Sequence, residues 1–382
     1  MSYRVLVLPE RPVMPLSVVR KIQELVAAGA TVIGPKPIRT PGLTGYPKSE
    51  QQLKNIADKV WGTKTASTQS QHSYGKGQII TGMTIRQVLE KGNIPADFAL
   101  QSRTDNVLLD FIHRRTDDTE IYFVINKRST KLHADCSFRV SDSQPELWNP
   151  ATGEQRDLPQ FKTHAGITSI PLEFEPYGAM FIIFRKTEDR SKKAGVLQRG
   201  AENFPVLIQR QEITGPWSVQ FDLKWFYPTN ELTGNHAKGL MVFEKLEDWN
   251  KRPEPAVKNF SGMAVYHKTF IMKSPAPGDR CFLDLGSVKE TARVKLNGKD
   301  LGVVWCSPWH LEITGIAKPG ENLLEIEVVN LWPNRLVGDK KLPVAERRTH
   351  KNMFVGWLNN DQLPSGLLGP VTIETVQQIN NK

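Results

Sequence analysis

The sequence has few cysteines and no long apolar run, and each shortage excludes a class of protein. Only three cysteines occur in 382 residues, Cys136, Cys281 and Cys306, and none of them forms a Cys-x-x-Cys pair. This pattern predicts neither a disulfide framework nor a cysteine-rich metal site. No run of 18 apolar residues is present, so no transmembrane helix and no membrane partner are expected. Hydrophobic residues at 39% and charged residues at 24% are ordinary for a folded globular protein.

Short motifs for several chemistries are also missing. The sequence contains neither a His-Glu-x-x-His zinc motif nor a Gly-x-Ser-x-Gly nucleophile elbow. Gly75-Lys76-Gly77 lacks the spacing of a phosphate-binding loop and precedes an apolar run, so a turn is expected there. The net charge is +10, but the basic residues are scattered and no nucleic-acid-binding motif accompanies them. Nucleic acid is therefore not expected as a partner.

The first hundred residues alternate strand and helix patterns. Strands are expected at residues 5–8, 31–33 and 78–80, and helices at 18–28, 53–61 and 84–91. Gly29 is a candidate left-handed C-cap and Ser49 a candidate N-cap. We expect a small, partial α/β domain with a parallel sheet over residues 1–105, similar to flavodoxin- or amidotransferase-type folds.

The remaining sequence reads as two antiparallel β domains. Short apolar runs separated by turn residues predict a small β-sandwich over 106–186, and the charged run that follows predicts a linker over 187–204. A second β domain is expected over 205–382. Its strongest signal is Asn297-Gly298 between alternating strands, because this pair favours the type I′ turn of a hairpin. Alternation resumes at Leu324, Ile326 and Val328.

No residue stands out as catalytic. A glycosidase needs two carboxylates that face one cleft, and acids are plentiful but none has a distinctive setting. Asp284, Glu325 and Glu327 lie in strand patterns and are predicted to be solvated surface carboxylates. The histidines show no metal-ligand spacing, and no metal or cofactor is predicted for the chain.

Tryptophan is the more suggestive residue type. Seven of the nine tryptophans lie between residues 217 and 357. A tryptophan ring offers a flat apolar face to a sugar, although it can equally fill a core. Trp217 and Trp305 lie inside strand patterns, so we expect both in the core. Trp309 and Trp332 lie at strand ends and are candidates for sugar binding.

The run that follows Trp332 supplies polar candidates for the same site. Asn334, Arg335 and Asp339 could hydrogen-bond sugar hydroxyls, and they complete the predicted sugar-binding set. An Arg335–Asp339 ion pair that holds a loop is the alternative interpretation, and it is slightly favoured.

Several of these segments together resemble glycoside hydrolase family 106, the α-L-rhamnosidases. The resemblance rests on residues 4–10, 29–37, 146–153, 330–339 and 363–371. The last domain also resembles the galactose-binding-like jelly roll of family 2 glycosidases. Family members carry their acid and base glutamates and a calcium site on a large N-terminal barrel, so the resemblance transfers no catalytic residue and no metal ligand to this chain.

The resemblance implies that this chain is the C-terminal, non-catalytic part of a rhamnosidase-like enzyme that hydrolyses terminal α-L-rhamnosides. A split gene, a mis-called start or a truncation would explain such a chain. Its expected partners are rhamnose-containing polysaccharide and the catalytic barrel. Family members are often exported, although residues 5–8 are too short an apolar run for a signal peptide. An autonomous carbohydrate-binding module and a glycosidase active on its own are the alternatives.

Overall fold

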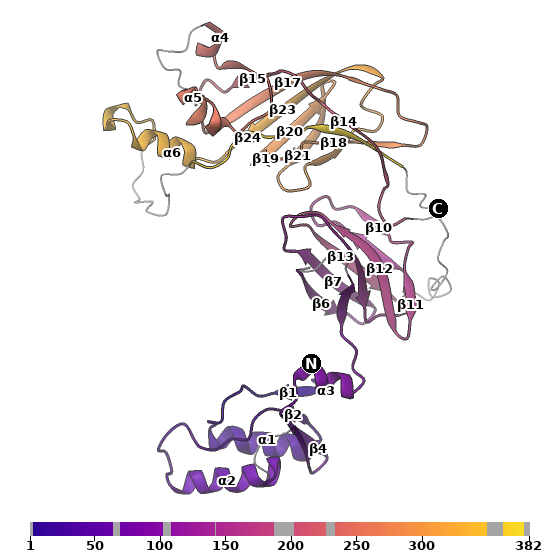
Figure 1. Ribbon diagram of the computed structural model, residues 1–382, viewed down its shortest axis with the longest axis vertical. Coiled ribbons are helices and arrows are strands. Elements are labelled where there is room, and N and C mark those ends of the chain that lie inside the picture. Colours follow the sequence, from indigo (N-terminus) through magenta and orange to yellow (C-terminus); the bar gives the residue numbers. More distant parts are fainter. Residues whose placement is uncertain are drawn as a thin grey trace. The chain divides into compact units, whose positions relative to one another are not determined.

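The computed structural model describes residues 3–63, 69–101, 108–141, 143–186, 202–226, 234–349 and 362–377. The chain divides into two compact units, Met1–Asp97 and Phe98–Lys382. Figure 1 shows helices packed beside the sheet of the first unit, whereas strands dominate the second unit, which also carries short helices. No helix in these ranges is long and apolar enough to cross a lipid bilayer. The division at residue 97 lies eight residues before the predicted boundary at 105, and the three-domain division itself stays a prediction.

The first unit is a four-stranded mixed sheet in the order β1-β2-β4-β3. The parallel pairing of β1 with β2 and of β2 with β4 was predicted, whereas the antiparallel β3 was not. Side chains of α1 and α2 form one core with the sheet. Val88 of α3 packs in a separate cluster with Ile33 and Ile80. The elements are β1 (Val5–Val7), α1 (Leu16–Ala28), β2 (Thr31–Ile33), α2 (Lys48–Trp61), β3 (Ser70–Tyr74), β4 (Gly77–Thr81) and α3 (Ile85–Lys91).

Cap residues mark two helix ends in this unit, whereas Ser49, a predicted cap, is not one. Gly29 adopts the predicted left-handed conformation, with φ at 119°, and its N–H donates to the end of α1. Thr84 forms a capping box with Gln87 at the start of α3. The N-cap prediction for Ser49 is wrong, because α2 begins at Lys48 and Ser49 is already inside the helix. The turn predicted at Gly75 joins β3 to β4.

The second unit begins with a two-sheet sandwich, here called the first sandwich. Its sheets have the orders β10-β9-β13-β7-β6 and β11-β12-β8-β5, and side chains such as Tyr122, Phe138 and Phe184 fill the core between them. All its pairings are antiparallel, as predicted. The strands are β5 (Phe98–Gln101), β6 (Leu109–Arg115), β7 (Thr119–Asn126), β8 (Leu132–Phe138), β9 (Pro145–Trp148), β10 (Gln155–Asp157), β11 (Lys162–His164), β12 (Ile167–Phe174) and β13 (Ala179–Arg185).

A larger two-sheet sandwich follows, here called the second sandwich. Its sheets have the orders β14-β25-β18-β22 and β16-β15-β17-β23-β20-β21, with a short β19-β24 pair. The strands are β14 (Leu207–Glu212), β15 (Trp217–Phe221), β16 (Leu240–Phe243), β17 (Met263–Met272), β18 (Arg280–Asp284), β19 (Val288–Lys289), β20 (Thr291–Leu296), β21 (Lys299–Val304), β22 (His310–Glu312), β23 (Gly320–Val329), β24 (Gly366–Leu367) and β25 (Thr372–Val376). Short helices α4 (Gly234–Ala237), α5 (Pro255–Lys258) and α6 (Pro333–Lys340) lie between strands, as do the 3-10 turns η2 (Trp249–Lys251) and η3 (Val344–Glu346).

The hairpin predicted at Asn297-Gly298 is confirmed. Both residues have positive φ, 53° and 79°, and they join β20 to β21. The alternation of Leu324, Ile326 and Val328 places all three in the core on β23, which pairs with β17 over ten residues. The jelly-roll assignment of this sandwich stays a prediction.

A short connection joins the two sandwiches. Asn203 is buried and fixed to the first sandwich, since its amide accepts from Gln160 N at 2.8 Å and donates to Gln160 O at 2.7 Å and to Pro171 O at 3.1 Å. Phe204 packs against the first core, and Leu207 already begins β14 of the second sandwich. Because only three residues separate these anchors, the distance between the sandwiches is tightly limited at this point.

A buried hydrogen-bond pair lies in the middle of the second core. The Tyr266 hydroxyl accepts the indole N–H of Trp249 at 2.6 Å and the backbone N–H of Leu367 at 3.1 Å. Neither ring is exposed to solvent. The hydroxyl therefore satisfies two donors that water cannot reach.

Replacing Tyr266 with phenylalanine should lower the free energy of unfolding by about 2–4 kcal/mol, because two buried N–H groups lose their acceptor. Urea denaturation measures the change. Tyr177→Phe, at a side chain that is 65% exposed, is the matched control and should change stability by less than about 0.5 kcal/mol. Equal stability of Tyr266→Phe and the wild type would contradict this account of the core.

Candidate functional site

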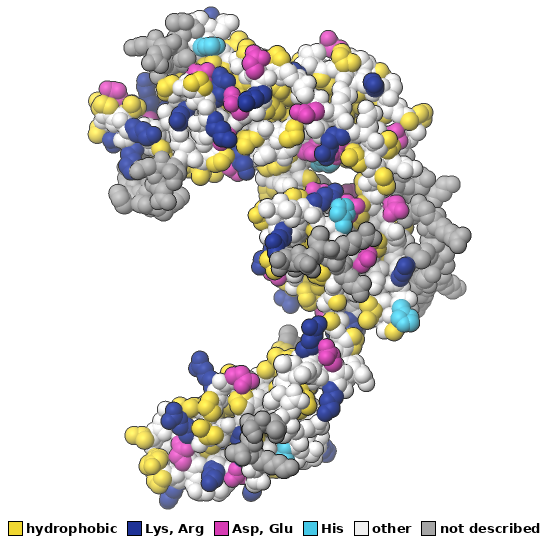
Figure 2. Space-filling model, in the orientation of Figure 1, with side chains coloured by type: hydrophobic (Ala, Val, Ile, Leu, Met, Phe, Trp, Pro, Cys, Tyr) yellow, Lys and Arg dark blue, Asp and Glu magenta, His cyan; other side chains and the backbone are white. Residues whose placement is uncertain are grey.

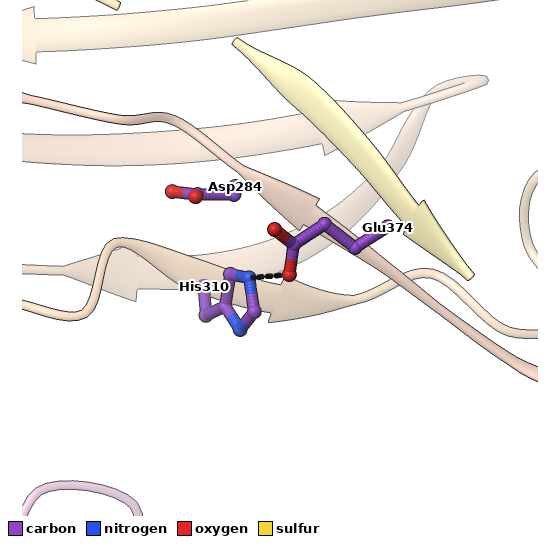
Figure 3. Close-up of side chains that lie close together, drawn as sticks. All are labelled: Asp284, His310 and Glu374. Atoms are coloured by element: carbon purple, nitrogen blue, oxygen red, sulfur yellow. Dashed lines mark ion pairs between the residues drawn. The ribbon is translucent and has the colours of Figure 1, made fainter. Parts of the chain in front are cut away.

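Three side chains that could share a proton or a metal ion meet on one sheet of the second sandwich. Asp284 ends β18, His310 begins β22, and Glu374 lies in β25 (Figure 3). The strand register pairs Asp284 with His310 and Phe282 with Glu374. One ligand atom from each of the three residues lies within 4.8 Å of the others.

Glu374 is the most enclosed member of this cluster. Its side chain is only 9% exposed. Oε2 lies 2.9 Å from His310 Nε2, and Oε1 accepts from Arg210 Nε at 2.8 Å and also from Arg210 Nη2. The hydrogen bond from His310, together with the Arg210 guanidinium, lowers the pKa of Glu374 to about 2, although burial opposes the shift. Glu374 is therefore ionised across the physiological range.

The pKa of the Asp284 carboxyl group is shifted in the opposite direction from that of Glu374. Burial raises the pKa of its carboxyl above the usual value, and the hydrogen bond from Gly286 N at 2.8 Å counteracts this only in part. The prediction that Asp284 is a solvated surface carboxylate is wrong, because the side chain is partly buried beside His310 and Glu374. Neighbouring strands supply the cover that the sequence of β18 alone does not reveal.

The imidazole of His310 is oriented by an aromatic neighbour. Its ring stacks on Phe282, with centroids 5.5 Å apart and planes at 13°. Stacking on Phe282 and the contact with Glu374 together restrict the rotation of the His310 ring. Sequence reasoning missed this site because its members are 26 and 64 residues apart, and their proximity depends on strand order.

The cluster does not fit the calcium ion that the family resemblance associates with the catalytic barrel. Calcium takes six to eight oxygen ligands, whereas this site offers one imidazole nitrogen and two carboxylates. The two oxygens of Glu374 already contact Arg210 and His310. Its contacts are those of an ion-pair network.

A cavity of about 890 Å³ opens beside the cluster, with His310 and Glu374 in its wall. The first sandwich contributes Tyr177 to the lining and the second contributes Trp305. The prediction that Trp305 fills the core is wrong, since it follows the end of β21 and is 64% exposed. The companion prediction for Trp217 is confirmed, because that ring is buried in the second core.

Charged groups of both signs are interspersed on the face drawn in Figure 2, with no continuous field of one sign among the described residues. This distribution agrees with the expectation from the sequence that the basic residues are scattered. It lacks the clustered basic stripe that typifies nucleic-acid-binding surfaces.

Two comparisons with known proteins indicate the same family. Residues 1–163 match the family model of glycoside hydrolase family 106, described as alpha-L-rhamnosidase. A solved structure of a rhamnosidase from Novosphingobium sp. PP1Y aligns with 98% of this chain, at 30% identity and a TM-score of 0.77. The resemblance to glycoside hydrolase family 106 is confirmed. The β-rich fold of this chain is accordingly rhamnosidase-like.

The aligned relatives are longer than this rhamnosidase-like chain. It covers 33% of the Novosphingobium rhamnosidase. It also aligns over 98% of its length with a curated protein of Formosa agariphila that is provisionally named a β-glucuronidase, at 23% identity and over 51% of that protein. The chain thus spans between a third and a half of the proteins it matches.

The tryptophans predicted to bind sugar, Trp309 and Trp332, are not among the residues that line the cavity. Trp309 is partly buried against the second core. Trp332 is 49% exposed and meets Trp225 edge to face, with centroids 5.0 Å apart. The role of Trp309 and Trp332 in sugar binding stays a prediction.

The polar members of the predicted sugar site are buried on and around α6. Asn334 donates to Leu363 O and to Ser365 Oγ, both at 2.8 Å, and accepts from Leu363 N at 2.7 Å. Arg335 Nη1 lies 3.7 Å from Asp339 Oδ1, so the ion-pair alternative matches the observed contacts. Asp339 Oδ2 also accepts from the backbone N–H and the hydroxyl of Thr349, both at 2.7 Å. These contacts fix chain segments, and a role in sugar binding stays a prediction.

Asn334→Ala should lower the free energy of unfolding by about 2–3 kcal/mol, because it leaves buried partners unsatisfied. Chemical denaturation measures this, with the exposed Asn235→Ala as the matched control. If Asn334→Ala kept the stability of the wild type and lost only its affinity for saccharide, the result would favour a sugar-binding role for Asn334.

Acid should weaken the rhamnosidase-like fold through Glu374. Its pKa is lower in the folded than in the unfolded chain, so its ionised form stabilises the fold above pH 4.5 and this contribution disappears as pH falls toward 2. We expect the wild type to lose on the order of 1–2 kcal/mol more than Glu374→Gln between pH 5 and pH 2, after allowance for solvent screening.

Urea titrations at several pH values test this expectation. Glu346→Gln removes a carboxylate at an exposed position and is the control for the loss of one acid. If the stability difference between wild type and Glu374→Gln stays constant from pH 5 to pH 2, the depressed pKa of Glu374 is refuted.

Proposed function

We propose that this chain is the non-catalytic, carbohydrate-binding and scaffolding part of an α-L-rhamnosidase-type glycoside hydrolase. The parent reaction would be hydrolysis of terminal α-L-rhamnosides in plant-type glycans. The observation that carries the proposal is the alignment of 98% of the chain with one third of a solved rhamnosidase. The family match over residues 1–163 supports it independently.

The geometry of the acid pair supports a non-catalytic role. Inverting glycosidases separate their two carboxyl groups by about 6.5–9.5 Å, which leaves room for the attacking water. Ligand oxygens of Asp284 and Glu374 lie within 4.8 Å of each other, too close for inverting chemistry but near the retaining spacing of about 5–5.5 Å, so the contacts of Glu374 decide the point. Glu374 is also committed to His310 and Arg210, so it has no free oxygen with which to attack a sugar or activate a water.

A glycosidase active on its own is the second candidate, and one observation favours it. The two carboxyl groups have pKa values shifted in opposite directions, raised for Asp284 and lowered for Glu374. Such a split is typical of an acid paired with a base. An ion-pair network also produces it, and the contacts with Arg210 and His310 favour that origin.

The purified chain should release no nitrophenol from p-nitrophenyl α-L-rhamnoside above the uncatalysed rate, because both oxygens of Glu374 are held by His310 and Arg210. A continuous absorbance assay measures this. Asp284→Asn and Glu374→Gln show whether any weak turnover depends on these two carboxyl groups or comes from a contaminating enzyme. Turnover by the wild type that both substitutions abolish would overturn the non-catalytic assignment and establish the second candidate.

A further inference from the structure

We propose that the cavity between the two sandwiches is a binding site for a neutral saccharide. The inference rests on the proposed function and locates its carbohydrate-binding activity. It assigns the site to Trp305, Tyr177 and the polar wall around Glu374. None of these residues belongs to the sugar-binding set predicted from the sequence, which includes Trp332.

Two exposed aromatic rings, one from each sandwich, line the cavity. Trp305, from the second sandwich, is 64% exposed, and Tyr177, from the first, is 65% exposed. Large apolar side chains left open to solvent within a cavity mark a ligand site more often than a fold requirement. Flat rings with a polar edge suit the C–H faces of a pyranose.

The charge balance of the lining identifies the ligand as neutral. Among the described residues that line the cavity, every lysine and arginine has a carboxylate partner: Lys131 with Glu173 and Glu175, Arg156 with Glu154, Arg210 with Glu374, and Arg280 with Glu312. An anionic sugar would have to compete with these partners for its cation. Hydroxyl groups, in contrast, can donate to a paired carboxylate and accept from a paired guanidinium without separating them.

The size and construction of the cavity agree with an oligosaccharide ligand. A volume of about 890 Å³ lies within the range of small-molecule sites. The anchor of Asn203 on the first sandwich and the start of β14 at Leu207 hold the two walls close together. His310, stacked on Phe282, lines the same cavity, so part of its polar wall is ordered before a ligand arrives.

Isothermal titration of the whole chain with neutral saccharides tests the inference. The probes are methyl α-L-rhamnoside, a rhamno-oligosaccharide and methyl β-D-galactoside, with D-glucuronate as the anionic comparison. We expect a neutral saccharide to bind and Trp305→Ala to weaken its affinity about ten-fold, because the stacking surface is lost. Tyr46→Ala, at an aromatic side chain that is 63% exposed and does not line the cavity, is the matched control and should bind like the wild type. Trp332→Ala tests the rival site, because Trp332 does not line the cavity either.

Each outcome decides between the two proposals. Loss of affinity in Trp332→Ala with none in Trp305→Ala would overturn the cavity site and leave the carbohydrate-binding function standing. Binding of D-glucuronate alone would overturn the neutral ligand class. If the wild type binds no saccharide in the panel, the carbohydrate-binding function itself is contradicted. Tyr177→Ala, on the first sandwich, is a second test of the cavity. Both Tyr177→Ala and Trp305→Ala should bind saccharide more weakly than the wild type, and both should unfold at the wild-type temperature.

Discussion

The placement of Glu374 constrains the sheet that carries the candidate site. A carboxylate in the middle of a four-stranded sheet is costly to bury unless it is paired. Arg210 pairs with it from the neighbouring strand β14, and His310 reaches it from β22 across β18. One ionised side chain on β25 thereby contacts side chains from both edge strands of this sheet, β14 and β22. The same arrangement places paired charges, rather than free ones, in the wall of the cavity.

Paired charges and exposed aromatic rings explain why binding is the role that this geometry supports. Catalysis of glycoside hydrolysis needs a carboxyl group free to give up or take a proton at the scissile bond. The contacts of Glu374 remove that freedom, yet they leave hydroxyl-binding capacity at the cavity surface. Family resemblance, acid geometry and cavity chemistry therefore support the same accessory role within a rhamnosidase-type enzyme.

Much of the fold was predictable because local signals were strong. Asn297-Gly298 specified a hairpin through its positive φ angles, and Gly29 specified the end of a helix. β3 was missed because Ser70–Tyr74 is mostly polar and gains its order from pairing with β4. Ser49 failed as a cap because the helix continues one residue upstream, at Lys48. Strand pairing decided the case of β3, and the sequence of a short segment does not contain it.

The site was harder to predict than the fold. Alternation along β18 and β25 implies that Asp284 and Glu374 point away from the core, but only strand order makes these strands neighbours. Trp305 was assigned to the core from its strand pattern, whereas β21 ends one residue earlier. Asn334 and Asp339 looked accessible in a polar run, yet α6 buries both. Long-range register and burial determine all of these outcomes.

The most direct test of the account is a crystal structure of the chain grown with methyl α-L-rhamnoside at saturating concentration. We expect the sugar ring to stack on Trp305, with its hydroxyl groups hydrogen-bonded to Glu374 and His310 in the cavity wall. A sugar bound only against Trp309 or Trp332, or a cavity that excludes the sugar at saturation, would contradict it.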